Sequence, residues 1–211
     1  MVVKQAIPGA YADINQVLSG AQAKEISDNG ILGISRYIPR EPALAAGNVT
    51  QPEMQAILEY LSLYFVQHCP LPNWLPTAAL GKQWGAYAVT YLKGIGAPPL
   101  VSTFLDLEGV ATSASDLDVI AYCNAWWEEV NSGGYTPGIY VGFGTNLSNT
   151  QLFVNLKFKS YWASYNTDQN IPTRGFQIKQ HTDKVLNGIS YGPDTISADL
   201  LGDLPSLLFN S

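Results

Sequence analysis

Apolar and polar positions follow two different periods along this chain. Alternation with a period of two residues predicts strands, whereas apolar residues at i, i+3, i+4 and i+7 predict one buried face of a helix. Residues 100–108 give the clearest strand pattern. Met54, Ile57 and Leu58 give a clear helical face, and Thr50 opens that helix with a capping sequence. Both kinds of element recur from one end of the chain to the other.

The predicted strands and helices alternate in sequence. Strands are predicted at residues 8–14, 31–37, 63–68, 100–108, 138–142, 160–165 and 176–181, with a less regular eighth strand around 185–199. Helices are predicted over 20–29, from Thr50 to Leu61, from Leu80 to Gly94 and from Ser115 to Gly133, and the proline-rich segment 69–79 is predicted as a loop. This alternation favours a mostly parallel sheet covered by helices. Since no composition break suggests a linker, we expect an α/β fold with one domain over residues 1–211, a single (β/α)8 TIM-like barrel with room for irregularity.

Composition and charge exclude several classes of function. The chain has 211 residues, of which 46% are hydrophobic, enough for a sizeable core. Neither a G-x-G-x-x-G turn nor a phosphate-binding GxxxxGK[ST] sequence occurs, and we expect no cofactor. The net charge of −6 argues against nucleic acid as a partner, because phosphate binding needs clustered Lys and Arg. No apolar run reaches about 18 residues, and the first residues lack a signal-peptide pattern, so we expect neither membrane insertion nor a secretion signal.

The cysteines and histidines give little support for a metal site. Cys69 and Cys123 are the two cysteines of a chain that is too large to need a disulfide, so we expect free thiols. With two histidines and no close ligand spacing, we expect no bound metal. His68 ends a predicted strand, where a structural role is favoured over one as an acid or base.

Two carboxylates on one predicted strand are the strongest chemical signal. In Thr103-Phe-Leu-Asp-Leu-Glu-Gly109, Asp106 and Glu108 share a face with Phe104, while Leu105 and Leu107 take the opposite face. In a barrel they would lie at the carboxyl end of a strand, where barrel enzymes place their active sites. Carboxylates about 6 to 7 Å apart along a strand raise each other's pKa, which allows one to act as a general acid. Strand-end polar residues without a catalytic role are the alternative.

Several segments, taken in order, resemble a known family. They are Gly9 to Asp13, Gly33-Ile-Ser-Arg-Tyr37, Phe104-Leu-Asp-Leu-Glu108, Gly134-Tyr-Thr-Pro-Gly-Ile-Tyr-Val-Gly142, Tyr161-Trp-Ala-Ser-Tyr165 and Gln177-Ile-Lys-Gln180. Their order and spacing resemble the glycoside-hydrolase-like TIM barrels of the domain of unknown function family 1906, relatives of the family 25 lysozymes. The resemblance covers nearly the whole chain. It implies a muramidase-like activity on peptidoglycan.

The same resemblance implies roles for four acids. Glu108 would be the general acid, and Asp106 would stabilise the developing charge or orient an acetamido group. Asp13 and Asp199 would support substrate and water. The segment 194–202 departs from the family pattern near the last strand, so Asp194 is an alternative to Asp199.

Polar and aromatic residues at other predicted strand ends are candidates for lining a sugar groove. They are Arg36, Gln67, Tyr140, Trp162 and Gln180. Trp162 is the strongest candidate, because aromatic faces pack on the C–H surfaces of sugars.

Three functions remain open from the sequence. The first is a peptidoglycan hydrolase that works as a lone, monomeric domain and reaches the cell wall as a phage lysin or an exported effector. The second is a barrel that binds a glycan without cleaving it, and the third is a structural barrel of a phage particle or secretion apparatus, because fold alone does not carry function.

Overall fold

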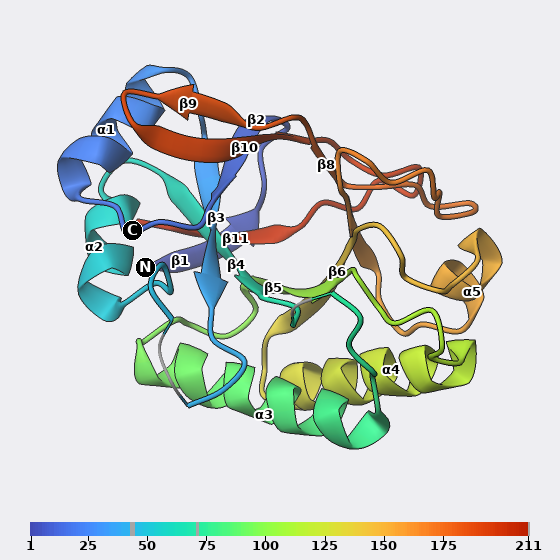
Figure 1. Ribbon diagram of the computed structural model, residues 1–211. Coiled ribbons are helices and arrows are strands. Elements are labelled where there is room, and N and C mark those ends of the chain that lie inside the picture. Colours follow the sequence, from blue (N-terminus) through green and yellow to red (C-terminus); the bar gives the residue numbers. More distant parts are fainter. Residues whose placement is uncertain (43–44, 71, 211) are drawn as a thin grey trace.

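The computed structural model describes residues 1–42, 45–70 and 72–210, and its centre is a closed barrel of eight strands. The barrel strands are β2 (Gly9–Ile14), β3 (Gly33–Ile38), β4 (Ser62–Gln67), β5 (Ser102–Leu107), β6 (Thr136–Val141), β7 (Ser160–Ala163), β8 (Ile178–Gln180) and β10 (Ile189–Ile196). From β2 to β8, each strand runs parallel to the next one in the barrel, as the sequence predicts. The predicted TIM-like barrel is confirmed in an irregular form (Figure 1).

The irregularity lies in the strand that closes the barrel. β10 pairs antiparallel with both β2 and β8. It follows β9 (Lys184–Leu186) through a tight turn in which Asn187 and Gly188 have φ values of 45° and 84°. An Asn-Gly turn of this kind joins antiparallel neighbours and leaves no length for a crossover helix. The eighth strand is therefore present inside the predicted range 185–199, but its direction is reversed.

Five helices pack around the barrel within the described part of the chain. They are α1 (Gly20–Asp28), α2 (Gln51–Leu58), α3 (Ala78–Gly94), α4 (Asp116–Ser132) and α5 (Asn149–Val154). The predicted capping residues Ser19 and Thr50 accept hydrogen bonds from the third residue of α1 and α2. α3 and α4 lie side by side along one flank of the barrel (Figure 1). The short α5 is absent from the sequence prediction because six residues give too little periodicity.

Two further strands that the sequence analysis misses lie at the amino-terminal end of the barrel. β1 (Val2–Gln5) and β11 (Ser206–Phe209) pair antiparallel, and Leu208 of β11 also pairs with Leu63 of β4. Both strands are four residues long, which is too short to show a clear alternation. They bring the two ends of the chain together (Figure 1).

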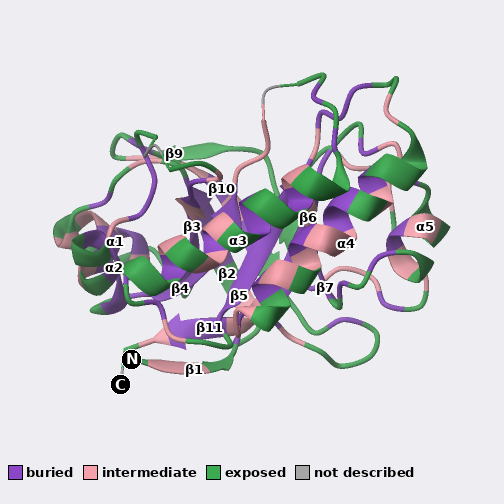
Figure 2. Cartoon of the chain, turned by 90° about the horizontal axis from the view of Figure 1, so that it is seen from below, coloured by how far each residue is buried: buried purple, intermediate pink, exposed green. Residues whose placement is uncertain are grey.

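Alternation along each strand divides the core into two layers. Outward residues such as Leu105 and Leu107 pack against the helices, while Phe104, Tyr64 and Trp162 fill the barrel interior. The predicted faces of β5 are thus confirmed. Figure 2 shows the buried barrel strands behind helices whose outer faces are exposed. None of the helices in the described ranges is long and apolar enough to cross a membrane.

Candidate active site at the barrel mouth

The carboxyl ends of the parallel strands bring several acids to one end of the barrel, here called the mouth. Asp13 is the penultimate residue of β2, Asp106 lies near the end of β5, and Glu108 directly follows β5. Asp13 and Asp106 are buried and Glu108 is half-buried. These three residues were predicted as catalytic, and the structure brings them together.

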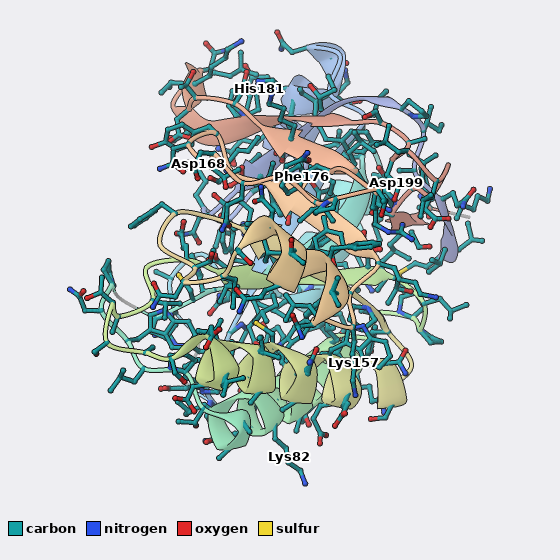
Figure 3. The ribbon with its side chains drawn as sticks, turned by 90° about the vertical axis from the view of Figure 1, so that its right-hand side faces the viewer. Lys82, Lys157, Asp168, Phe176, His181 and Asp199 are labelled. Carbon is teal, nitrogen blue, oxygen red and sulfur yellow. The ribbon has the colours of Figure 1, made fainter. Side chains whose placement is uncertain are left out.

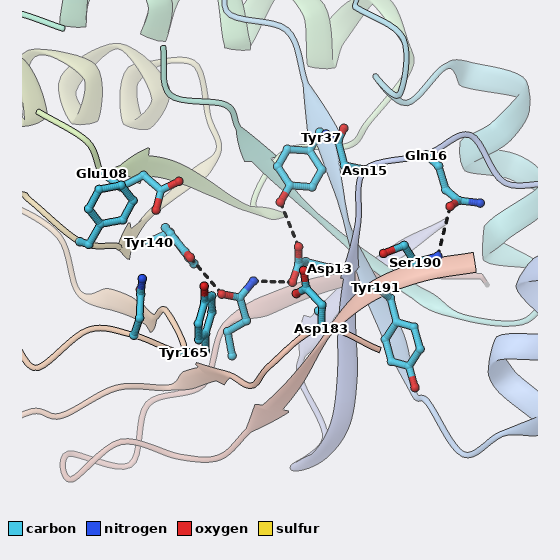
Figure 4. A pocket seen from close by; sticks show the side chains of 14 residues that line it. Asp13, Asn15, Gln16, Tyr37, Glu108, Tyr140, Tyr165, Asp183, Ser190 and Tyr191 are labelled. Carbon is cyan, nitrogen blue, oxygen red and sulfur yellow. Dashed lines mark hydrogen bonds between the residues drawn. The ribbon is translucent and has the colours of Figure 1, made fainter. Parts of the chain in front are cut away.

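Asp13 is held by neutral hydrogen-bond donors. The Tyr37 hydroxyl donates to its Oδ1 at 2.9 Å, and Nε2 of Gln180 donates to its Oδ2 at 2.7 Å. The Tyr140 hydroxyl in turn donates to Oε1 of Gln180 at 3.0 Å (Figure 4). Burial raises the pKa of Asp13 to about 6, although the bonds from Gln180 and Tyr37 oppose the shift.

Asp106 and Glu108 form an acidic pair with few partners. The Cys69 backbone N–H donates to Oδ2 of Asp106 at 3.2 Å, whereas the buried Oδ1 accepts no hydrogen bond from the described residues. Burial, and then the charge of Glu108, raise the pKa of Asp106 to about 7. Burial also raises the pKa of Glu108, and the charge of Asp13 adds to the shift. Near neutral pH this pair therefore retains a proton that ordinary carboxyl groups would lose.

A further acid lies below the mouth, inside the barrel. Asp194 on β10 accepts from Nε1 of Trp162 at 2.9 Å and from the Tyr64 hydroxyl at 3.3 Å. Burial, followed by the charge of Asp13, raises the pKa of Asp194 well above its usual value. Asp194, which the sequence analysis kept as an alternative, is thus the acid that β10 brings near Asp13.

The structure does not bring Asp199 to the mouth. Because β10 runs antiparallel, its carboxyl end and the following residues lie at the amino-terminal end of the barrel. There Nη1 of Arg174 contacts Oδ2 of Asp199 at 2.5 Å, and Gln177, which precedes β8, donates to the same oxygen at 3.0 Å. In Figure 3, Asp199 lies to the right of His181, which follows β8.

The predicted groove residues divide into two sets. Tyr140 and Gln180 line the main pocket, whereas Trp162 is 1% exposed, fills the barrel interior and reaches only the inner pocket. Arg36 points outward instead, and its fully buried guanidinium pairs with Glu53 at 2.8 Å. Gln67 also points outward.

Gln67 has a structural set of partners. It accepts from Nε1 of Trp126 at 2.6 Å and donates to the backbone carbonyls of Pro39 and Trp84. Arg36 and Gln67 therefore join the barrel to its outer layer.

Glu108 lines three neighbouring pockets. The main pocket, of about 400 Å³, is lined by Asp13 and by Tyr37, Tyr140, Tyr165 and Tyr191 (Figure 4). The inner pocket, of about 100 Å³, descends to Asp106 and Trp162. The side pocket, of about 330 Å³, lies between Arg40, Pro72 and Phe143. Because Glu108 lines all three, it lies where they meet.

Several residues at the mouth escaped the sequence analysis. Tyr37 was not proposed as a site residue, because its neighbour Arg36 was proposed instead. Alternation places these two residues on opposite faces of the strand. Gly142 and Gly192 allow close approach, since a Cβ atom at Gly142 would overlap Glu108 and one at Gly192 would overlap Asp13. A glycine in the sequence indicates that another group can approach the backbone closely at that position. The sequence does not show which residue approaches it.

His68 and Cys69 complete the wall of the inner pocket. The His68 ring stacks on Tyr37 with centroids 4.1 Å apart. Burial, and then the charge of Arg40, lower the pKa of His68 to about 4, which keeps the ring neutral near pH 7. The Cys69 sulfur and carboxylate oxygens of Asp106 and Glu108 lie within 4.8 Å of one another, so these three side chains have the spacing to hold a metal ion.

Comparison with known proteins identifies a family model and solved structures that are similar to this chain. The Rv2525c-like family model, described as a glycoside hydrolase-like domain, matches residues 24–199. The Mycobacterium tuberculosis Tat-secreted protein Rv2525c, solved in complex with HEPES, superposes with a TM-score of 0.68 at 16% identity, over 90% of this chain and 96% of that chain. A B. stearothermophilus protein gives 0.65 at 16% identity, over 92% and 99%. The muramidase from Trichobolus zukalii gives 0.59 at 14% identity, over 90% and 94%.

The solved structures are similar in fold, whereas the family model identifies the family. The structural neighbours share the fold at low identity, and no curated protein matches the chain. The matching family model describes a glycoside hydrolase-like domain, and the closed barrel of eight strands fits that description. Since the family model matches most of its length, the chain belongs to the Rv2525c-like family, and the resemblance found in its sequence is confirmed.

Proposed function

We propose that this protein is a muramidase-like peptidoglycan hydrolase whose acids at the barrel mouth cleave a glycosidic bond. One observation carries the proposal. Asp13 and Glu108 line the main pocket, Asp106 and Glu108 line the inner pocket, the pKa of each acid is raised, and no lysine or arginine among the described residues lines either pocket. Acids kept partly protonated without cationic partners are suited to proton transfer.

Glu108 has the position of the general acid. It is half-buried at the junction of the three cavities, so a bond lying across this junction can receive its proton. Asp106 lies deeper, on the wall of the inner pocket, where its carboxyl group can stabilise positive charge on the sugar or orient an acetamido group. Asp13, fixed by Tyr37 and Gln180, supports the bound sugar or water from the opposite wall.

The spacing of the acidic pair supports retention of anomeric configuration. The nearest carboxylate oxygens of Asp106 and Glu108 lie within 4.8 Å of each other. Inverting enzymes need about 6.5 to 9.5 Å between carboxyl groups to admit a water molecule, whereas retaining enzymes use about 5 to 5.5 Å. A pair whose nearest oxygens are this close fits the retaining spacing better than the inverting one.

The lining of the main pocket supports a glycan as substrate. Amide side chains and tyrosines provide hydrogen-bond partners and ring faces, the combination that binds sugars. The fold shared with the Trichobolus zukalii muramidase supports the cell-wall polymer as the glycan.

The test is release of reducing sugar from purified peptidoglycan, with mass spectrometry of the fragments. Wild type should release fragments ending in reducing N-acetylmuramic acid, and Glu108→Gln should lower the rate by about 100-fold or more, because general acid catalysis contributes roughly 10²- to 10⁴-fold. Glu59→Gln, on the exposed end of α2, is the matched control and should retain full activity.

The alternative functions give different outcomes. If wild type binds peptidoglycan but releases no fragments, the hydrolase is ruled out and the barrel is a glycan-binding module. Equal activity of wild type and Glu108→Gln would remove Glu108 from the mechanism.

A further inference from the structure

The charges on the two sides of Glu108 differ. On one side, the main pocket contains the carboxyl groups of Asp13 and Asp183, without any lysine or arginine among the described residues that line it. On the other side, the side pocket contains the guanidinium of Arg40 next to His68. A negatively charged group on a bound glycan would be repelled from the first side and attracted to the second.

Arg40 differs from the other two arginines of the chain. Arg36 is paired with Glu53, and Arg174 is paired with Asp199 and Asp203. Arg40 forms no ion pair within the described residues. It is half-buried, which makes an unpaired charge more costly than on an open surface.

Neutral groups hold Arg40 in place. Its Nη1 donates to the Cys69 carbonyl at 2.7 Å, and its guanidinium carbon lies 5.8 Å from the centroid of the Trp84 ring. These contacts orient the side chain but leave its charge uncompensated and further N–H groups free of carboxylate partners. A guanidinium fixed in this way is suited to bidentate binding of a carboxylate.

The remaining walls of the side pocket suit the body of a sugar substituent. Pro70, Pro72 and Phe143 give it an apolar lining, with Phe143 shared between the side and main pockets. An apolar wall beside a fixed cation matches a group that carries a methyl or methylene next to a carboxylate. The neutral His68 ring does not compete with Arg40 for such an anion.

We propose that the side pocket is a carboxylate-binding subsite, in which Arg40 binds the acidic substituent of an alternating glycan and so fixes which sugar lies on each side of Glu108. The inference rests on the proposed function for its glycan. The carboxylate can belong to the lactyl group of a muramic acid without peptide or to the peptide that a substituted muramic acid carries.

The test measures binding by calorimetry in the Glu108→Gln background, so that the ligand is not consumed. Three probes separate the possibilities: a tetrasaccharide alternating N-acetylglucosamine and N-acetylmuramic acid, the same tetrasaccharide bearing peptides, and neutral chitotetraose. Arg40→Gln should weaken binding of at least one acidic probe by about 10- to 100-fold, the range for a charge-assisted hydrogen bond, and leave chitotetraose unchanged. The acidic probe that responds identifies the source of the carboxylate.

Two matched variants control for charge and for folding. Arg40→Lys should recover part of the lost affinity, and Lys82→Gln, on the exposed face of α3, should bind like the parent. Circular dichroism verifies that the Arg40 variants fold. The subsite is overturned if Arg40→Gln weakens acidic and neutral probes equally, or if the parent binds no acidic probe. Arg40-dependent binding without hydrolysis by wild type would instead keep the subsite and reject the hydrolase.

Discussion

Buried aspartates at the two ends of the barrel have opposite environments. At the mouth, Asp13 and Asp106 have neutral partners, and burial raises their pKa to about 6 and about 7. At the amino-terminal end, burial would also raise the pKa of Asp199, but backbone N–H groups, Gln177 and Arg174 together hold it below its usual value.

The difference separates two uses of a buried acid. Asp199 accepts four hydrogen bonds, one of them from the cation Arg174, so its charge is compensated and stabilises the folded chain. Asp106 has one backbone donor to Oδ2 and an oxygen without a partner, so its charge costs folding energy. Both side chains are nearly inaccessible to solvent, since Asp106 is 6% and Asp199 is 8% exposed, but Asp106 lies deeper in the protein. Their hydrogen-bond partners differ as well.

The largest expected effect on stability concerns a buried acid that is paired with a cation. The substitution Arg36→Met would leave Glu53 buried without its cation, and the free energy of unfolding should fall by about 3 to 5 kcal/mol. Urea unfolding measures this loss. Glycan affinity per folded molecule should stay unchanged, because Arg36 points away from the mouth. A weakened affinity with normal stability would return Arg36 to the sugar groove.

An intermediate effect is expected at the amino-terminal end. Asp199→Asn removes the charge that Arg174 and two backbone N–H groups contact, and it should lower the free energy of unfolding by about 2 kcal/mol. The midpoint of thermal unfolding should fall by about 4 to 8 °C, with the rate of peptidoglycan cleavage retained. Lost activity with unchanged stability would break the comparison between the two ends.

The smallest effect is a difference in pH dependence. Since the folded pKa of Asp106 is raised above its unfolded value, protonation favours the folded state at low pH, and this contribution is lost as pH rises toward and through about 7. Asp106→Asn should therefore gain stability relative to wild type as pH rises from 4 to 8. Thermal unfolding at a series of pH values measures the gain.

The other acid gives the opposite sign and serves as the control. The folded pKa of Asp199 is lowered, so its stabilising contribution is present above its unfolded pKa and is lost as pH falls below about 4. The stability difference between wild type and Asp199→Asn should therefore shrink in acid. Parallel pH profiles for the two variants would contradict the contrast.

Sequence periodicity predicted most of the fold for a physical reason. Seven parallel strands follow from alternation and from the helices that separate most of them, and the shared face of Phe104, Asp106 and Glu108 follows from the two-residue period. The direction of β10 did not follow, because a period of two is the same for parallel and antiparallel strands. The turn at Asn187-Gly188 was the local signal for reversal.

The candidate site was predictable only in part. Alternation shows which residues share a face but not which face turns inward, so Arg36 and Gln67 were proposed where Tyr37 and Val66 line the interior. Asp199 was proposed from the family resemblance, which implies an acid near the last strand, and the reversed direction of β10 places it at the other end of the barrel. Contacts such as that of Gly192 with Asp13 join distant parts of the chain, and a single sequence does not show them.

The pairing of β1 with β11 has a consequence for the order of folding. Val2 pairs with Phe209, and β2 closes the barrel by pairing with β10. Strands that are synthesised early therefore pair with strands that are synthesised late. During synthesis from the amino terminus, the parallel strands can assemble one by one while β1 and one edge of β2 stay unpaired. Closure therefore depends on contacts of very high sequence separation, which form slowly, and the open barrel edge is the point at which a nascent chain is most exposed to mispairing.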